Sequence, residues 1–107
     1  MNVITNNNVK CTIALAVLQN VEDPEIGLNV VDLGLIYQVD FDEEQAKIFC
    51  TMTLTTQFCP MAAALSEAVK RALQKTFTDM DVHLEVTFNP PWSHERISAD
   101  GQLFLNQ

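Results

Sequence analysis

Cys59 occupies the position in this sequence where a side chain is best placed to do chemistry. It lies in the stretch TTQFCPM, and Pro60 follows it directly. Proline suits the first position of a helix, where its missing N–H is not needed, so the sequence predicts Cys59 at the N-cap. Amide groups and the helix dipole at that position stabilise a thiolate, which makes the sulfur nucleophilic and metal-binding. Thr55 and Thr56 could add hydroxyl donors.

The simpler alternative is that Cys59 is a small buried residue that caps a helix poorly, because Ser, Thr, Asp and Asn are preferred there. Its neighbours in the sequence include no basic residue. Position still favours a functional thiol. Cys11 and Cys50 instead follow the apolar patterns of regular elements and are predicted to be core residues. Three cysteines without a CxxC pair argue against a disulfide framework and against a self-contained zinc site.

The remaining polar candidates carry weaker signals. Asp23 and Glu25, on either side of Pro24, could supply oxygen ligands or a base, although such a loop more often only ends a helix. His83 and His94 share no motif spacing. Trp92 is predicted to anchor the core, with an exposed partner contact as the alternative.

Charge and composition exclude several classes of partner. The 107 residues carry a net charge of −8, which disfavours nucleic acid and anionic membrane surfaces as partners. No apolar run approaches the roughly 20 residues needed to cross a bilayer, and the N-terminus does not resemble a secretory signal. We therefore expect one cytoplasmic domain spanning residues 1–107.

Hydrophobic spacing predicts the elements that position Cys59. A helix is expected from about Val9 to Val21, and a helical turn closed by Gly34 follows the acidic loop. Alternation predicts strands over 35–41 and 47–55, joined by a hairpin at 42–45. A helix over 60–76 and a strand over 81–88 complete the series.

This order predicts an α+β, two-layer helix-strand-strand-helix-strand domain, with a mixed three-stranded sheet and both helices on one face. The second and third strands could lie parallel, because a helix connects them. The tail after Asn89 cannot be regular strand, since adjacent prolines lack amide donors. The outer sheet face is expected to lack a helical cover, which leaves it open to solvent, to a docking partner or to a second copy; it would carry Phe49, Thr51, Thr53, His83, Glu85 and Thr87.

Three segments together resemble a known family. They are DPEIGLNVVDLGLIYQV from Asp23, TMTLTTQFCPM from Thr51 and NPPW from Asn89. In this combination the chain is similar, from about Val21 to Gly101, to the SufT/PaaD-like small domains. That family includes bacterial iron-sulfur assembly factors, the phenylacetate-degradation component PaaD and a subunit of the eukaryotic cytosolic iron-sulfur targeting complex.

The resemblance implies the same helix-strand-strand-helix-strand fold and assigns site residues. The cysteine of the family's threonine-threonine-x-x-cysteine-proline motif bears the function, which here is Cys59. The acidic loop and the threonines form a pocket beside it, which carries over to Asp23, Glu25, Thr55 and Thr56. One departure is visible: Gln57 and Phe58 stand where relatives usually have a proline and a small residue, so Phe58 could shield the thiol.

The function implied is a non-enzymatic accessory role in assembling iron-sulfur clusters or transferring them to client proteins. Cys59 would bind iron or a cluster transiently, with no stable prosthetic group, and partners would be assembly proteins or client apoproteins. A homodimer is a further possible assembly. The alternative is a PaaD-like accessory subunit that docks on one metal-dependent oxygenase. A hydrolase or transferase with Cys59 as nucleophile is disfavoured, since no His/Asp relay is evident.

Overall fold

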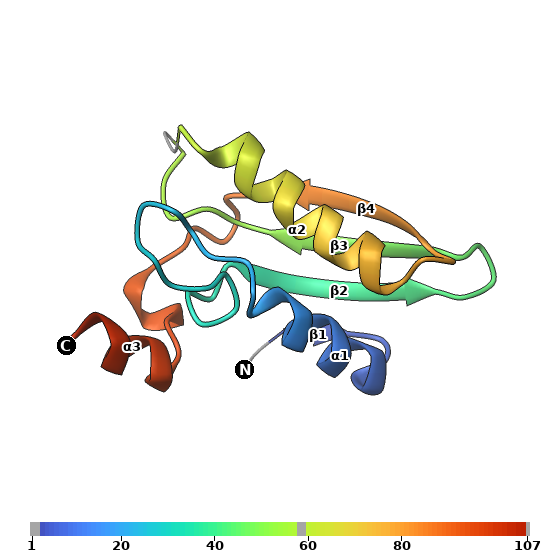
Figure 1. Cartoon of the computed structure of the whole chain (residues 1–107), viewed down its shortest axis with the longest axis horizontal. Helices are drawn as coiled ribbons and strands as arrows, with labels where there is room; N and C mark the ends of the chain where they lie inside the picture. Colours follow the sequence, from blue (N-terminus) through green and yellow to red (C-terminus); the bar gives the residue numbers. More distant parts are fainter. Residues whose placement is uncertain (1–2, 58–59, 107) are drawn as a thin grey trace.

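A computed structural model describes residues 3–57 and 60–106 of the chain. Figure 1 shows a layer of helices lying across an elongated sheet. The elements in chain order are β1 (Ile4–Thr5), α1 (Asn8–Leu18), β2 (Ile36–Asp42), β3 (Lys47–Met52), α2 (Ala62–Thr76), β4 (Asp81–Val86), the 3₁₀ turn η1 (His94–Arg96) and α3 (Ala99–Leu105).

The sheet is mixed and has the strand order β1-β2-β3-β4. β2 and β3 form the predicted antiparallel hairpin, and β3 and β4 lie parallel, which confirms the expected helical crossover. The prediction of a three-stranded sheet was wrong, because β1 adds a fourth strand parallel to β2. β1 is too short to show alternation. The Asn6 side chain holds this edge in place, because it donates to the Phe41 carbonyl and accepts from the Phe41 amide, each at 2.9 Å.

Two of the three helices lie where the sequence placed them. α1 and α2 cover the same face of the sheet and contact each other. Asn7 caps α1 by accepting from the Lys10 amide at 3.0 Å, and α1 ends three residues before the predicted Val21. α3 was not predicted. It lies at the end of the molecule where β2 begins (Figure 1).

The core fills the space between the sheet and the two covering helices. The alternation along β3 is confirmed, since Ile48, Cys50 and Met52 are buried while Phe49 is exposed. Leu65, Val69 and Leu73 of α2 pack against them from one stripe of the helix. The prediction that Thr53 lies on the outer face of the sheet was wrong, because the exposed fraction of its side chain is 0%. β3 ends at Met52 rather than Thr55, so the alternation no longer applies beyond that residue.

None of the helices in the described ranges has the length and apolar character needed to span a membrane.

Candidate functional site

The three segments that carry the family resemblance meet at one end of the sheet. β2 runs antiparallel to β3, and β4 runs parallel to β3. The residues before β2, after β3 and after β4 must therefore lie at the same end, which is on the left in Figure 1. We call this the motif end and define it as residues 21–35, 53–57 and 87–92.

Backbone and side-chain hydrogen bonds tie the motif end together. The Thr53 amide donates to the Leu35 carbonyl at 2.8 Å, and the Thr87 amide donates to the Met52 carbonyl at 2.8 Å. The indole N–H of Trp92 donates to the Leu33 carbonyl at 2.6 Å. Trp92 is half-buried and packs against the core, which confirms its predicted anchoring role. The three segments are thus fixed relative to one another.

The two carboxylates of the acidic loop have different surroundings. Asp23 is 2% exposed, and its Oδ1 accepts from the Glu25 amide at 2.9 Å. The Asp23 amide also donates to the Leu28 carbonyl, and the Asp23 carbonyl accepts from the Gly27 amide. These two hydrogen bonds close the loop. Glu25 is exposed. Asp23 therefore shapes the loop, while the carboxylate of Glu25 is available to solvent.

A helical turn follows this loop and closes as predicted. Leu35 N–H donates to the Val30 carbonyl and Gly34 N–H to the Val31 carbonyl, both at 3.0 Å, which is a Schellman arrangement. Gly34 has a φ of +76°, and a Cβ at this position would lie 2.3 Å from the Arg96 carbonyl oxygen. Only glycine permits this close approach of the tail.

The segment that leads toward Cys59 is described as far as Gln57. Thr55 is half-buried and Thr56 is exposed. Cys59 and Phe58 lie outside the described residues, so the positions predicted for the thiol and for its shield stay predictions. The predicted start of the helix was wrong: α2 begins at Ala62 and its N-cap is Met61. The reason is that Pro60 and Met61 form a turn ahead of the helix.

The other two thiols belong to the core, as predicted. Cys11 on α1 is 4% exposed and Cys50 on β3 is 1% exposed. Burial raises the pKa of Cys11, and burial also raises the pKa of Cys50, to about 12. Both thiols are therefore held protonated near neutral pH and are poor ligands for a metal.

A polar network at this end was not predicted. Asp32 accepts from Asn29 Nδ2 and from Ser98 Oγ, each at 2.7 Å. Ser98 also caps α3 by accepting from the Gly101 amide at 3.0 Å. The Ser-Ala-Asp start of α3 is a sequence signal for a helix N-terminus that could have revealed this element. The network joins the turn before β2 to the tail.

The described residues contain no group of three His, Cys, Asp or Glu side chains placed to hold a metal ion. Asp23, Glu25, Thr55 and Thr56 come from segments that share the motif end, and their relation to Cys59 stays a prediction.

Comparison with protein families gives a match over most of the chain. Residues 12–88 match the family described as iron-sulfur cluster assembly protein. A Bacillus subtilis protein named Fe-S protein maturation auxiliary factor YitW is 37% identical over 85% of this chain and 88% of its own length. The Fe-S protein maturation auxiliary factor SufT of Staphylococcus aureus is 36% identical over 78% of this chain and 93% of its own length.

Solved structures show the same fold. A domain of unknown function from Bacillus anthracis superposes with a TM-score of 0.83 at 38% identity, covering 89% of this chain and 90% of its own. A conserved hypothetical protein from Thermotoga maritima gives 0.76 at 34% identity, covering 100% of this chain and 99% of its own. The Thermotoga maritima structure extends the likeness to β1 and the tail, which lie outside the family match.

Proposed function

Because the chain belongs to the iron-sulfur cluster assembly protein family, in its SufT-like branch, we propose that it is a non-enzymatic accessory factor in iron-sulfur protein maturation. It would help to assemble clusters or to transfer them to client proteins. A third relative, from Porphyromonas gingivalis and 39% identical, is also named an Fe-S protein maturation auxiliary factor. The names of these relatives support this function over docking on a single oxygenase.

The observation that carries the proposal is the convergence at the motif end. The acidic loop, the segment leading to Cys59 and the segment with Trp92 come from distant parts of the sequence and meet at one end of the sheet. A working residue needs rigid neighbours to hold its geometry. The hydrogen bonds of Thr53, Thr87 and Trp92 supply that rigidity.

Cys59 is the thiol that we propose as the working group. Cys11 and Cys50 are buried with raised pKa values, so neither competes for iron or for a cluster in the folded protein. One thiolate cannot hold a cluster alone, because clusters usually take four cysteine ligands. The remaining ligands would come from an assembly partner, a client or a small thiol. Iron or the cluster is thus cargo, bound transiently.

The residues around the thiol would divide into two roles. Asp23 is a positioning residue, since its carboxylate holds the loop through the Glu25 amide. Glu25, Thr55 and Thr56 would line the path to Cys59. An exposed carboxylate such as Glu25 suits contact with a partner or with iron.

Rescue in cells tests the function. In a strain that lacks its own family member, we expect wild-type protein and Cys11→Ala to restore the activity of an iron-sulfur enzyme such as aconitase. We expect Cys59→Ser to fail although the protein accumulates to the same level. The reason is that a serine hydroxyl binds iron more weakly than a cysteine thiolate does. Full rescue by Cys59→Ser would refute the proposal.

A pair of substitutions at Asp23 separates folding from function. Asp23→Asn keeps an oxygen that can accept from the Glu25 amide, so we expect its melting temperature to stay close to that of wild type. Asp23→Ala removes the acceptor and should lose about 1 kcal/mol of unfolding free energy. If Asp23 only positions the loop, Asp23→Asn will restore enzyme activity fully; a failed rescue with an unchanged melting temperature would show that its charge acts directly.

A further inference from the structure

The side of the sheet away from α1 and α2 is open over its hairpin half. Near the start of β2 the tail packs on Tyr37, whose hydroxyl donates to the Pro90 carbonyl at 2.9 Å. The Arg96 guanidinium also lies 4.5 Å from the centre of the Tyr37 ring. Toward the hairpin, Phe49 is 42% exposed and His83 is exposed, and farther along the edge strand β4 Glu85, which pairs with Thr51, is exposed as well. The tail thus covers one half of this side and leaves the other half to solvent.

Strand register gathers acidic side chains on the open half. Asp40 pairs with Phe49, Phe49 with His83, and Asp42 with Lys47, so these side chains share one face. We call this surface the acidic sheet face and define it as Asp40, Asp42, Phe49, Asp81, His83 and Glu85. The exposed Glu44 extends it at the hairpin, and Lys47 lies between Asp42 and Asp81 in the strand register.

Most carboxylates of this surface form no ion pair in the part of the chain that the structure describes, although Lys47 is the cross-strand neighbour of both Asp42 and Asp81. Within residues 3–57 and 60–106, the ion pairs that involve the face or the hairpin are His83–Asp81 at 3.1 Å and Lys10–Glu43. Asp40 accepts from the neutral Gln38 side chain at 2.6 Å, and Asp42 accepts from a backbone amide. The face therefore carries an excess of negative charge.

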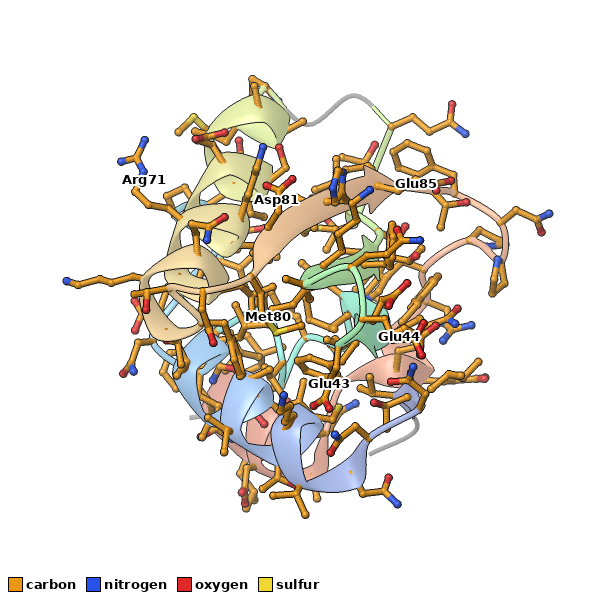
Figure 2. All side chains as sticks on the ribbon, turned by 90° about the vertical axis from the view of Figure 1, so that its right-hand side faces the viewer. Glu43, Glu44, Arg71, Met80, Asp81 and Glu85 are labelled. Carbon is orange, nitrogen blue, oxygen red and sulfur yellow. The ribbon has the colours of Figure 1, made fainter. Side chains whose placement is uncertain are left out.

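Positive charge gathers on the opposite side of the molecule. The exposed Lys70, Arg71 and Lys75 lie on α2, with Glu67 as their acidic neighbour. Figure 2 shows Arg71 projecting from α2 on one side, while Glu44 and Glu85 lie on the other side of the sheet and Glu43 lies beside α1. The net charge of −8 is thus unevenly distributed, and the open sheet half is its acidic side.

An aromatic platform lies among these carboxylates. The rings of Phe49 and His83 are stacked, with centres 5.4 Å apart and planes inclined by 22°. Phe49 also lines a hollow of about 580 Å³ together with Asp40, Asp42 and Glu44. Carboxylates beside an exposed ring suit a guanidinium group, which stacks on aromatic faces and binds carboxylates with two parallel hydrogen bonds.

We propose that the acidic sheet face docks an arginine-containing segment of a partner protein. Charge complementarity selects a basic partner and speeds the encounter. The Phe49–His83 platform selects arginine over lysine, because a guanidinium is planar and weakly hydrated. A second copy of this chain would have to dock through the basic side of α2, giving a head-to-tail contact that has no self-complementary geometry. This docking surface goes beyond the proposed function and does not depend on Cys59.

A peptide probe tests the proposal on the full chain. We would measure fluorescence anisotropy of a labelled seven-residue peptide with arginine at alternate positions, and of the same peptide with lysines. We expect the arginine peptide to bind more tightly and its affinity to fall with salt. Glu44→Lys/Glu85→Lys should weaken binding about tenfold, since exposed charge pairs contribute modestly and each reversal also adds repulsion.

The matched control is Glu67→Lys/Asp100→Lys, which makes the same change in net charge at exposed positions on α2 and α3, away from the face. It should alter the affinity less than about twofold. Equal losses in both double variants would overturn the proposal, because binding would then follow only the net charge. Absence of binding at low salt would overturn it as well, as would sedimentation showing that the acidic face is occupied by a second copy.

Phe49 allows the platform to be tested separately from charge. Phe49→Leu keeps an apolar side chain at an exposed position, so the fold should be retained. We expect this variant to lose the preference for arginine over lysine, with about a threefold drop for the arginine peptide. An unchanged preference would refute the role of the aromatic platform.

Discussion

The motif end and the acidic sheet face represent two different ways of using the same sheet. At the motif end, three distant segments are tied by the hydrogen bonds of Thr53, Thr87 and Trp92, and the acidic loop is closed on the buried Asp23. On the acidic sheet face, exposed and half-buried side chains stand on regular strands, and few of them bond to one another. One region is rigid and specified residue by residue, and the other is specified mainly by its charge.

This difference suggests how each region tolerates substitution. A rigid end holds a working residue in place, so single changes there should affect folding and function together. A charged face acts through the sum of its groups, so single changes should leave folding unaffected and should alter binding gradually. The following predictions test that contrast.

Gly34→Ala should have the largest effect on stability. Its new Cβ would lie 2.3 Å from the Arg96 carbonyl, and its φ is +76°. We expect a loss of about 3 kcal/mol of unfolding free energy in urea titrations, because the backbone of the tail must move. Gly27→Ala is the matched control: its φ is +82° with no atom within 4 Å, so about 1 kcal/mol is expected. Equal losses would contradict the close approach of the tail.

Trp92→Phe should have the next largest effect. It removes the indole donor to the Leu33 carbonyl and part of the apolar contact with the core. We expect a loss of about 2 kcal/mol in thermal or urea unfolding, because an orphaned buried carbonyl is costly. Tyr37→Phe removes an exposed hydrogen bond to Pro90 and should cost less than about 0.5 kcal/mol. A reversed order would show that the tail is anchored through Tyr37 instead.

Single neutralisations on the acidic side should have the smallest effect on stability. Glu85→Gln and Glu44→Gln remove exposed charges that stand among like charges. We expect unfolding free energies within about 0.5 kcal/mol of wild type, with any change toward greater stability at low salt. A loss above 1 kcal/mol, measured by urea unfolding, would mean that these carboxylates are part of the folding framework.

The sequence predicted the elements whose hydrophobic pattern is long enough to be periodic. β3 alternates over six residues, and α2 repeats at helical spacing, so both elements were found, and the buried face of β3 was predicted correctly as far as Met52. β1 has two residues and depends on Asn6 bonds to Phe41, which no local pattern reveals. Thr53 was misplaced because a period-2 pattern does not show where a strand ends. Long-range contacts decide these features.

In the candidate site, too, some features could be predicted from the sequence and others could not. The difference between Asp23 and Glu25 could not be read from the sequence, because burial of one and exposure of the other follow from how the loop closes. The core positions of Cys11 and Cys50 were predictable, since each follows an apolar pattern. The predicted helix start at Pro60 was wrong because proline favours a helix start without fixing it, and here Pro60 and Met61 form a turn before Ala62.

The central claim is that Cys59 is the working thiol, and native-state alkylation followed by mass spectrometry tests it most directly. Iodoacetamide at pH 8 should label Cys59 in the folded protein and leave Cys11 and Cys50 unlabelled until urea is added. The reason is that burial keeps both core thiols protonated, with the pKa of Cys50 raised to about 12. Labelling of Cys59 only after denaturation would contradict the account.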